Sequence, residues 1–321
     1  MSVDSINPHK KIAVVSSFKS QGRCTNWRGW VQAFDSYFDE WVSYDICEMT
    51  IPDITEAIIK TAPDFLFVFL CDGLRCDMRR IKEGGTKIVY IFGDWVLDDR
   101  IPIAESVRYF DYMFLSNKDQ IPTYKKLYGI NSVHFLPTAC YKYDGMFPYN
   151  GKYQGDITFV GLLDERENPL NIYKERMLIW DAVRKEYGAR AKAYNTPAYP
   201  ERNDTYDMLP EIYNSSQYVL SISAVQEGMK SYTSARLWSI LNLCGLALVH
   251  RFDGMEEFGL EDMYNCVAFG NFEELRDKVA VLDSDYDKRM EIKMAGYVLG
   301  VKKHTGIERL KEVVRVINDL A

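Results

Sequence analysis

Short apolar runs alternate with polar segments along the first half of the 321-residue chain. The runs are rich in β-branched and aromatic residues and are bounded by polar loops, which is typical of buried strands. They occupy residues 11–18, 64–70, 87–94, 109–117 and 132–139. Helical periodicity is found between strands, at residues 30–38 and 118–129. This alternation predicts a parallel sheet that helices cover on both faces.

The alternation restarts after residues 142–156, a segment rich in Gly, Tyr and Lys that is typical of a linker. In the second half, strands are expected at residues 156–161, 218–224 and 265–270, and helices at residues 170–188, 208–217, 271–282 and 305–320. Residues 231–250 add a capped helix and a further strand. The two halves therefore share one architecture.

The predicted fold class is α/β, with two tandem Rossmann-like domains. We expect an N-terminal domain at residues 1–148, a C-terminal domain at residues 149–300, and an amphipathic helix at residues 301–321 that packs back toward the first domain. Ligands bind beyond the carboxyl ends of the strands in such sheets. A cleft between the two sets of strand ends is therefore the expected place for chemistry.

Composition narrows the function classes. A strongly basic composition would indicate a nucleic-acid partner, and this chain, with a net charge of −7, does not have such a composition. No apolar run approaches the roughly 18 residues of a membrane span, and residues 1–11 lack a signal-peptide core. The seven cysteines form no CxxC pair, so we expect reduced thiols and a cytoplasmic protein. The oligomeric state stays open.

Several familiar catalytic motifs are absent from the sequence. The chain has no GxGxxG, no P-loop, no HExxH and no GxSxG. Its four histidines are scattered, so no metal site is predicted. The acidic pair Asp283 and Asp285 lies just before an expected helix rich in charge, and we interpret it as a capping turn. Neither a dinucleotide cofactor nor a catalytic metal is therefore expected.

Residues 231–250 contain the most informative candidate, Arg236. Ser231, Thr233 or Ser234 would cap a helix, and Arg236 would lie in its first turn. The positive end of a helix disfavours a cation but binds anions well, so an anionic ligand would explain the arginine. The alternative is a surface arginine paired with an acid such as Glu227.

A second candidate follows the strand expected at residues 156–161. Gly161 would let a ligand approach the backbone closely, and Arg166 could reach a diphosphate from the same loop. Lys174 and Arg176 are expected on the solvent face of the following helix. Arginines from two loops suit a diphosphate because a guanidinium binds phosphate oxygens in a bidentate manner.

Asp94 is the candidate for acid–base chemistry. It stands at the carboxyl end of the strand at residues 87–94, beside an aromatic residue. A carboxylate there could act as general base toward a hydroxyl, and partial burial would raise its pKa. The alternative is that Asp94 caps the following turn.

Two blocks of sequence resemble a known family. The first contains "KIVYIFGD" and "DITFVG", and the second contains "SARLWSILNLCGLALVH". With the tandem domains, they resemble GT-B glycosyltransferases over most of the chain. The first block is similar to the spore-maturation CgeB-like group. The arginine–tryptophan order and the strand followed by Asp resemble the bacteriophage DNA β-glucosyltransferase.

The resemblance implies specific roles at the donor side. Arg236 would hold the diphosphate of a nucleotide-sugar, taken to be UDP-linked, with Arg166 as its partner and Tyr232 as a further phosphate contact. Asp94 would be the general base of an inverting displacement, and no metal would be required. The family has an acid for the ribose hydroxyls three positions after the arginine, but this chain has Ser239 there.

The acceptor side is predicted on the aromatic and basic loop at residues 18–30. Its candidates are Arg23, Trp27, Arg28 and Trp30, although one tryptophan is expected to anchor the first helix instead. A hydroxymethylated base in phage DNA, which the enzyme would have to flip out, is one acceptor. A protein, cell-surface or spore-coat glycan is another. A non-catalytic sugar-nucleotide or DNA-binding module is the alternative from a different class.

Overall fold

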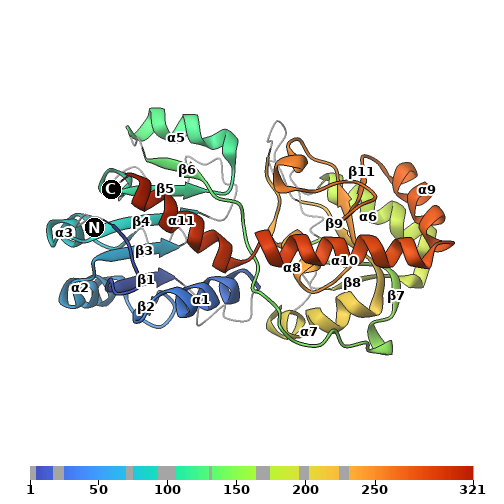
Figure 1. Cartoon of the computed structure of the whole chain (residues 1–321), viewed down its shortest axis with the longest axis horizontal. Helices are drawn as coiled ribbons and strands as arrows, with labels where there is room; N and C mark the ends of the chain where they lie inside the picture. Colours follow the sequence, from blue (N-terminus) through green and yellow to red (C-terminus); the bar gives the residue numbers. More distant parts are fainter. Residues whose placement is uncertain are drawn as a thin grey trace. The chain divides into compact units, whose positions relative to one another are not determined.

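The chain forms two compact units in a computed structural model (Figure 1). The structure describes residues 5–16, 25–69, 75–92, 106–129, 132–163, 174–194, 202–223 and 231–320. The first unit comprises Met1–Gly22, Asn26–Thr138 and Gly306–Ala321, and the second comprises Arg23–Thr25 and Ala139–Thr305. The sequence-based boundaries at residues 148 and 300 differ from the limits at Thr138 and Thr305 by ten and five residues.

The first unit is built on a parallel sheet with the order β2-β1-β3-β4-β5-β6 within the described residues. The strands are β1 (Ile12–Ser16), β2 (Trp41–Asp45), β3 (Phe65–Phe69), β4 (Lys87–Phe92), β5 (Tyr112–Leu115) and β6 (Val133–Phe135). Ile12 is the register partner of both Trp41 and Phe65. The apolar runs are buried because helices cover both faces of a parallel sheet. The order reverses between β1 and β3, which makes this the switch point of the sheet.

Helices cover this sheet. They are α1 (Thr25–Tyr37), α2 (Ile51–Thr61), α3 (Met78–Glu83), α5 (Ile121–Tyr128) and α11 (Gly306–Leu320), with short 3-10 turns at Val107–Tyr109 and Lys118–Gln120. Sequence patterns did not predict β2 or α2. The start of α2 is nevertheless well encoded, since Thr50 accepts a hydrogen bond from the backbone N–H of Asp53 and Pro52 occupies the first turn.

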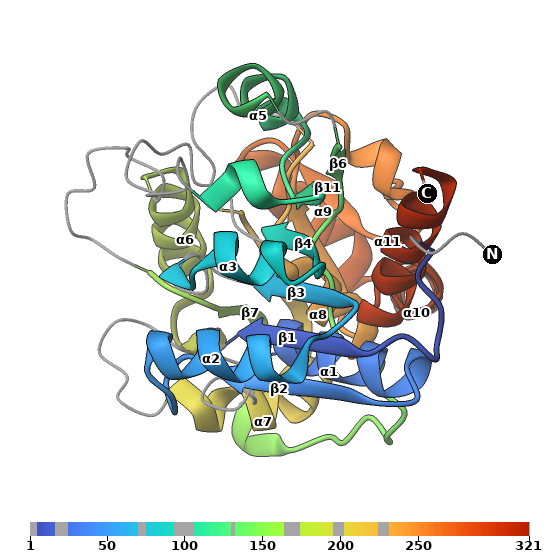
Figure 2. The same cartoon turned by 90° about the vertical axis from the view of Figure 1, so that its left-hand side faces the viewer.

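The C-terminal helix α11 belongs to the first unit. Its Asn318 accepts a hydrogen bond from the Ile6 N–H at 2.7 Å and donates one to the Ile6 carbonyl at 3.0 Å, so the two ends of the chain lie side by side (Figure 2). At the start of α11, a Cβ on Gly306 would lie 2.0 Å from the Gly29 carbonyl oxygen of α1. A glycine is therefore needed where α11 approaches α1.

The second unit contains a parallel sheet with the order β11-β10-β9-β7-β8 within the described residues. The strands are β7 (Gly155–Val160), β8 (Ala191–Tyr194), β9 (Ser216–Ser221), β10 (Ala247–His250) and β11 (Val267–Phe269). The helices are α6 (Lys174–Tyr187), α7 (Arg202–Ser215), α8 (Ala235–Asn242), α9 (Phe272–Asp283) and α10 (Tyr286–Lys303), with 3-10 turns at Gly151–Tyr153, Gly188–Arg190 and Met255–Phe258. In this sheet the order reverses between β7 and β9.

Helix α10 is the charged helix expected after Asp283 and Asp285, and its first residues fit the capping interpretation. Asp285 is its N-cap and accepts a hydrogen bond from the Lys288 N–H at 2.9 Å, so the capping turn is confirmed. Further along, Cβ atoms on Gly296 and Gly300 would lie within 3.0 Å of the Asn265 carbonyl oxygen and the Leu241 Cβ, respectively. The two glycines let α10 pack closely on α8 and the adjoining loop.

Candidate functional site

Arg236 lies at the carboxyl ends of β7 and β9, the switch point of the second unit. Its Nε donates to the Val160 carbonyl, and its Nη1 donates to the Ile222 carbonyl at 2.9 Å. The guanidinium carbon is also 4.7 Å from the centre of the Phe159 ring, in cation–π geometry. Ligands bind at such switch points because the loops there diverge. The half-buried guanidinium thus has a defined position where an anion would bind.

Gly161 provides the space in which this guanidinium lies. Its φ of 151° falls in a region that favours glycine. A Cβ at this position would lie 2.2 Å from Nη2 of Arg236 and 2.8 Å from its Cζ. The sequence predicted that Gly161 would let a ligand approach the backbone. In the structure, the side chain of Arg236 lies against Gly161.

Arg176 is the second arginine at this switch point, and its predicted place on the solvent face of α6 is wrong. The side chain is only 3% exposed. Its Nη1 donates to the Leu162 carbonyl at 2.8 Å and its Nε donates to the Ile222 carbonyl at 3.2 Å. Its guanidinium carbon is 5.6 Å from the centre of the Phe159 ring. Residue 176 points inward because it shares a helix face with the buried Ile179, Trp180 and Val183.

The N-terminus of α8 faces the same strand ends. Ser234 is the N-cap, and its backbone N–H donates to the Ser223 hydroxyl at 3.1 Å. Its own hydroxyl oxygen is buried and has no hydrogen-bond partner among the described residues. The helix start carries a partial positive charge, and Arg236 in the first turn adds a full one. This end of α8 has the electrostatics of an anion site.

Two further residues of the segment 231–250 were predicted to bind the nucleotide-sugar, and both are largely buried. Tyr232 is 5% exposed and follows Ser231, whose φ is 47°. Ser239 is 2% exposed, and its hydroxyl donates to the Ala235 carbonyl at 3.0 Å, one turn earlier in α8. A serine in a helix often bonds back to the preceding turn in this way. The ribose role of Ser239 stays a prediction.

Both tryptophans of the predicted acceptor loop are core residues of the first unit. Trp27 is 8% exposed and Trp30 is 4% exposed. Their rings pack on Phe69 of β3, with centroid distances of 6.0 Å and 5.0 Å. The prediction that one of them would present a face to an acceptor is corrected, because apolar packing uses both rings. Arg28 is half-buried.

Four residues named from the sequence lie outside the described residues: Arg23, Asp94, Arg166 and Glu227. Asp94 comes two positions after Phe92, the last residue of β4. Arg166 comes six positions after the last residue of β7. The predicted pair of Arg166 and Arg236 is thus not described, and the arginines that the structure brings together are Arg176 and Arg236.

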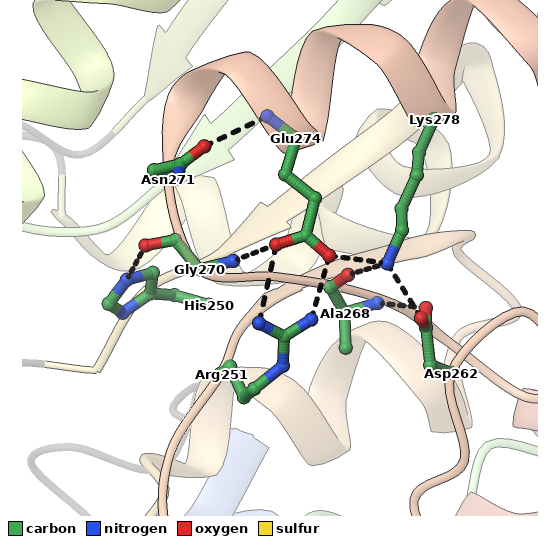
Figure 3. Close-up of polar contacts among 8 residues, drawn as sticks. All are labelled: His250, Arg251, Asp262, Ala268, Gly270, Asn271, Glu274 and Lys278. Atoms are coloured by element: carbon green, nitrogen blue, oxygen red, sulfur yellow. Dashed lines mark hydrogen bonds and ion pairs between the residues drawn. The ribbon is translucent and has the colours of Figure 1, made fainter.

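A charge network lies at the carboxyl ends of β10 and β11 (Figure 3). Glu274 of α9 binds the Arg251 Nη2 at 2.7 Å and the Lys278 Nζ at 2.8 Å, and accepts a hydrogen bond from the Gly270 N–H at 2.8 Å. Hydrogen bonds from Arg251 and then Lys278 lower the pKa of Glu274 to about 2. Lys278 also binds Asp262 at 2.6 Å. This network joins α9 to the ends of both strands.

Two searches of the described residues bear on ligands and membranes. No group of three or more His, Cys, Asp or Glu side chains in the described part of the chain could hold a metal ion. No described helix combines the length and the apolar character that a membrane crossing requires. The described cysteines are Cys47, Cys76, Cys140, Cys244 and Cys266, and no disulfide joins any two of them. Burial raises the pKa of Cys266 to about 12, as expected for a packed thiol.

Solved structures with the same architecture come from several organisms. HepE of Anabaena in complex with UDP-glucose matches with a TM-score of 0.65 at 10% identity, over 97% of this chain and 100% of HepE. The sucrose-phosphate synthase of Thermosynechococcus elongatus matches with a TM-score of 0.59 at 8% identity, over 98% and 100%. A glycosyltransferase from Rickettsia africae has a TM-score of 0.59 at 10% identity, over 98% and 99%. The chain has the GT-B fold.

A family model described as glycosyl transferase-like matches residues 174–315, from α6 into α11. This segment contains Arg176, Ser234 and Arg236, so the switch-point arginines fall within the matched part. No curated protein shows significant sequence similarity to the chain. The glycosyl transferase-like match covers less than half of the chain, and the solved structures share its GT-B fold.

Proposed function

We propose that this GT-B chain transfers a sugar from a nucleoside-diphosphate sugar to a hydroxyl acceptor. The single observation that carries the proposal is Arg236, held at the switch point of β7 and β9 and in the first turn of α8. A diphosphate is the ligand group that suits a guanidinium beside a helix N-terminus. HepE, which shares the fold, was solved with UDP-glucose, and this supports a UDP-linked donor.

The donor half of the reaction is where the described residues contribute most. The diphosphate would lie between Arg236 and the start of α8, where the buried Ser234 hydroxyl could donate to a phosphate oxygen. The positive charge would stabilise the diphosphate as it leaves the sugar carbon. Arg166 and Tyr232 remain candidates for further phosphate contacts, and Ser239 for a ribose contact. The resemblance supplies these three assignments.

The acceptor half rests on the resemblance alone. Asp94 remains the candidate general base, and attack by the activated hydroxyl on the opposite face of the sugar would invert the anomeric carbon. A hydroxymethylated DNA base and a protein or surface glycan remain the two acceptor classes, with Arg23 and Arg28 as candidate contacts. Gel-shift binding to modified duplex DNA separates these acceptors, because loss of all DNA affinity at low salt excludes the first.

The donor proposal is tested by calorimetric titration of UDP and UDP-glucose into wild type, Arg236→Gln and Arg184→Gln. Arg184 is an exposed arginine of α6, eight positions after Arg176, so its variant removes the same charge at the surface of the helix. We expect Arg236→Gln to weaken UDP binding by about 100-fold, the loss of a charge-assisted contact pair. Arg184→Gln should bind as wild type does.

Two results would overturn the proposal. One is the absence of binding and of slow donor hydrolysis across UDP-, GDP- and ADP-linked sugars, which would favour a non-catalytic module or a different ligand. The other is unchanged UDP affinity in Arg236→Gln. Because Arg236 also holds two carbonyls, the folded state of each variant is checked by thermal unfolding before the titration.

A further inference from the structure

Arg176 and Arg236 come from different helices and meet at one backbone oxygen. The Ile222 carbonyl, just after β9, accepts hydrogen bonds from Nε of Arg176 at 3.2 Å and from Nη1 of Arg236 at 2.9 Å. Each guanidinium also holds a carbonyl after β7 or at its end, Leu162 for Arg176 and Val160 for Arg236. The two side chains therefore tie together the two strands that diverge at the switch point.

The two arginines differ in their access to a ligand. Arg176 is 3% exposed, so its guanidinium lies behind the surface, whereas Arg236 is half-buried. Both guanidinium carbons lie within 6 Å of the Phe159 ring, at 5.6 Å and 4.7 Å. Placing two like charges on one ring and one carbonyl is unfavourable by itself, because repulsion grows where the dielectric constant is low.

We propose that Arg176 is a positioning residue for the diphosphate. By holding the Leu162 and Ile222 carbonyls, it fixes the strand ends to which Arg236 is bonded, and its charge adds to the positive potential behind Arg236. Arg176 acts through Arg236 and does not touch the ligand. The inference rests on the proposed function, since it assigns a role at the same donor site.

The structural reason is pre-organisation. The side chain of Arg236 has several rotatable bonds. Holding its guanidinium in one orientation before binding lowers the entropy cost of binding a phosphate. The Ile222 carbonyl is the shared point, so a change at residue 176 reaches Arg236 through one backbone atom. The nucleoside alone lacks the phosphate groups that Arg236 would bind. Loss of Arg176 should therefore affect diphosphate binding selectively.

The test is a double-mutant cycle read with two probes, UDP and uridine. The variants are Arg176→Gln, Arg176→Lys, Arg236→Gln and the double variant Arg176→Gln with Arg236→Gln. We expect Arg176→Gln to weaken UDP binding about tenfold and Arg176→Lys about threefold, since lysine restores the charge but only part of the hydrogen bonding. Uridine affinity should stay within about twofold of wild type. In the Arg236→Gln background, Arg176→Gln should add less than about twofold, because coupled residues are not additive.

Arg184→Gln is the matched control, because it removes an arginine from the solvent side of the same helix. Should Arg176→Gln fail to fold, the cycle is completed with Arg176→Lys, which keeps the charge in place. Equal losses for UDP and uridine, or full additivity with Arg236→Gln, would show that Arg176 is only structural and would overturn the inference. The inference is also overturned if wild type binds UDP and both Arg176 variants bind it with the same affinity. The proposed function stands in that case. If wild type binds neither probe, both proposals fall.

Discussion

Arg309 in the first unit and Arg236 in the second both donate to backbone carbonyls that follow strands. Arg309 of α11 binds the Pro137 carbonyl through Nε at 2.9 Å and the Thr138 carbonyl through Nη2 at 3.4 Å. These residues follow β6, the edge strand of its sheet. Arg236 instead lies where β7 and β9 diverge in the middle of its sheet. The same kind of contact thus occurs at two different places in the same kind of sheet.

The surroundings of the two arginines explain why only one is a ligand candidate. Arg309 is 8% exposed, and burial lowers its pKa to about 10, so it is still protonated at neutral pH. Arg236 is more exposed, shares a carbonyl with Arg176 and stands in the first turn of α8. A buried arginine on carbonyls is therefore no sign of a ligand site by itself. Position at a switch point and a nearby helix N-terminus make the difference.

The largest effect that separates the two sites is expected for Arg309→Met. Methionine keeps much of the apolar stem but leaves the Pro137 and Thr138 carbonyls without their donor. We expect the free energy of unfolding to fall by about 3 kcal/mol, the cost of two buried acceptors left unpaired. Chemical denaturation measures this loss, and UDP affinity at a temperature where the variant is folded should match wild type.

Arg315→Met is the control for this prediction, because Arg315 lies on the same helix and is 59% exposed in its side chain. Its ion pairs with Glu312 and Asp319 are surface contacts, so the variant should unfold close to wild type. A stable Arg309→Met protein would mean that water replaces the arginine at these carbonyls. A loss of UDP affinity in Arg309→Met would contradict the division between a structural and a ligand-binding arginine.

A smaller effect is expected for Gly161→Ala, which tests Arg236, the ligand-binding arginine of the comparison. The added Cβ would meet Nη2 of Arg236 at 2.2 Å, and alanine disfavours a φ of 151°. The guanidinium must move away from its carbonyls, so UDP affinity should fall about tenfold, or about 1.4 kcal/mol. Gly151→Ala is the control, since a Cβ there has no neighbour within 4 Å among the described residues. Unchanged UDP affinity in Gly161→Ala would show that the observed position of Arg236 is not the one that binds.

The sequence predicted the elements whose patterns are strong. Alternating apolar runs and helical periods predicted two parallel sheets, and the GT-B fold confirms them. Strands β2 and β8 were missed because they are short and mix polar with apolar residues, as in "WVSYD" and "AKAY". They are recognised as strands by their pairing with β1 and β7, which a local pattern does not contain. The packing of Trp27 and Trp30 on Phe69 is likewise a contact between distant segments.

The same limit applies to the candidate site. Arg236 could be selected because a cation in the first turn of a capped helix is unusual. Arg176 could not, since an arginine near the start of an amphipathic helix is ordinarily solvated. One signal was available: residue 176 precedes the buried Ile179, Trp180 and Val183 by three, four and seven positions. The carbonyls that make its burial possible belong to β7 and β9, and their proximity is a property of the sheet.

The smallest effect is expected at the charge network of Glu274. This network is separate from the contacts of Arg236 and of Arg309 that the comparison uses. The pKa of Glu274 is about 2 in the folded protein, lowered by Arg251 and then Lys278, and about 4.3 in an unfolded chain. The stabilisation is therefore complete above pH 4.3 and is lost as the pH falls toward 2. The full shift would stabilise the folded state by about 3 kcal/mol, and solvent screening of a side chain that is 31% exposed reduces this to about 1 kcal/mol.

Denaturation between pH 5 and pH 2 should show a shallower loss of stability in Glu274→Gln than in wild type, and the exposed Glu273→Gln should follow wild type. Parallel pH profiles for wild type and Glu274→Gln would show that water screens the network completely.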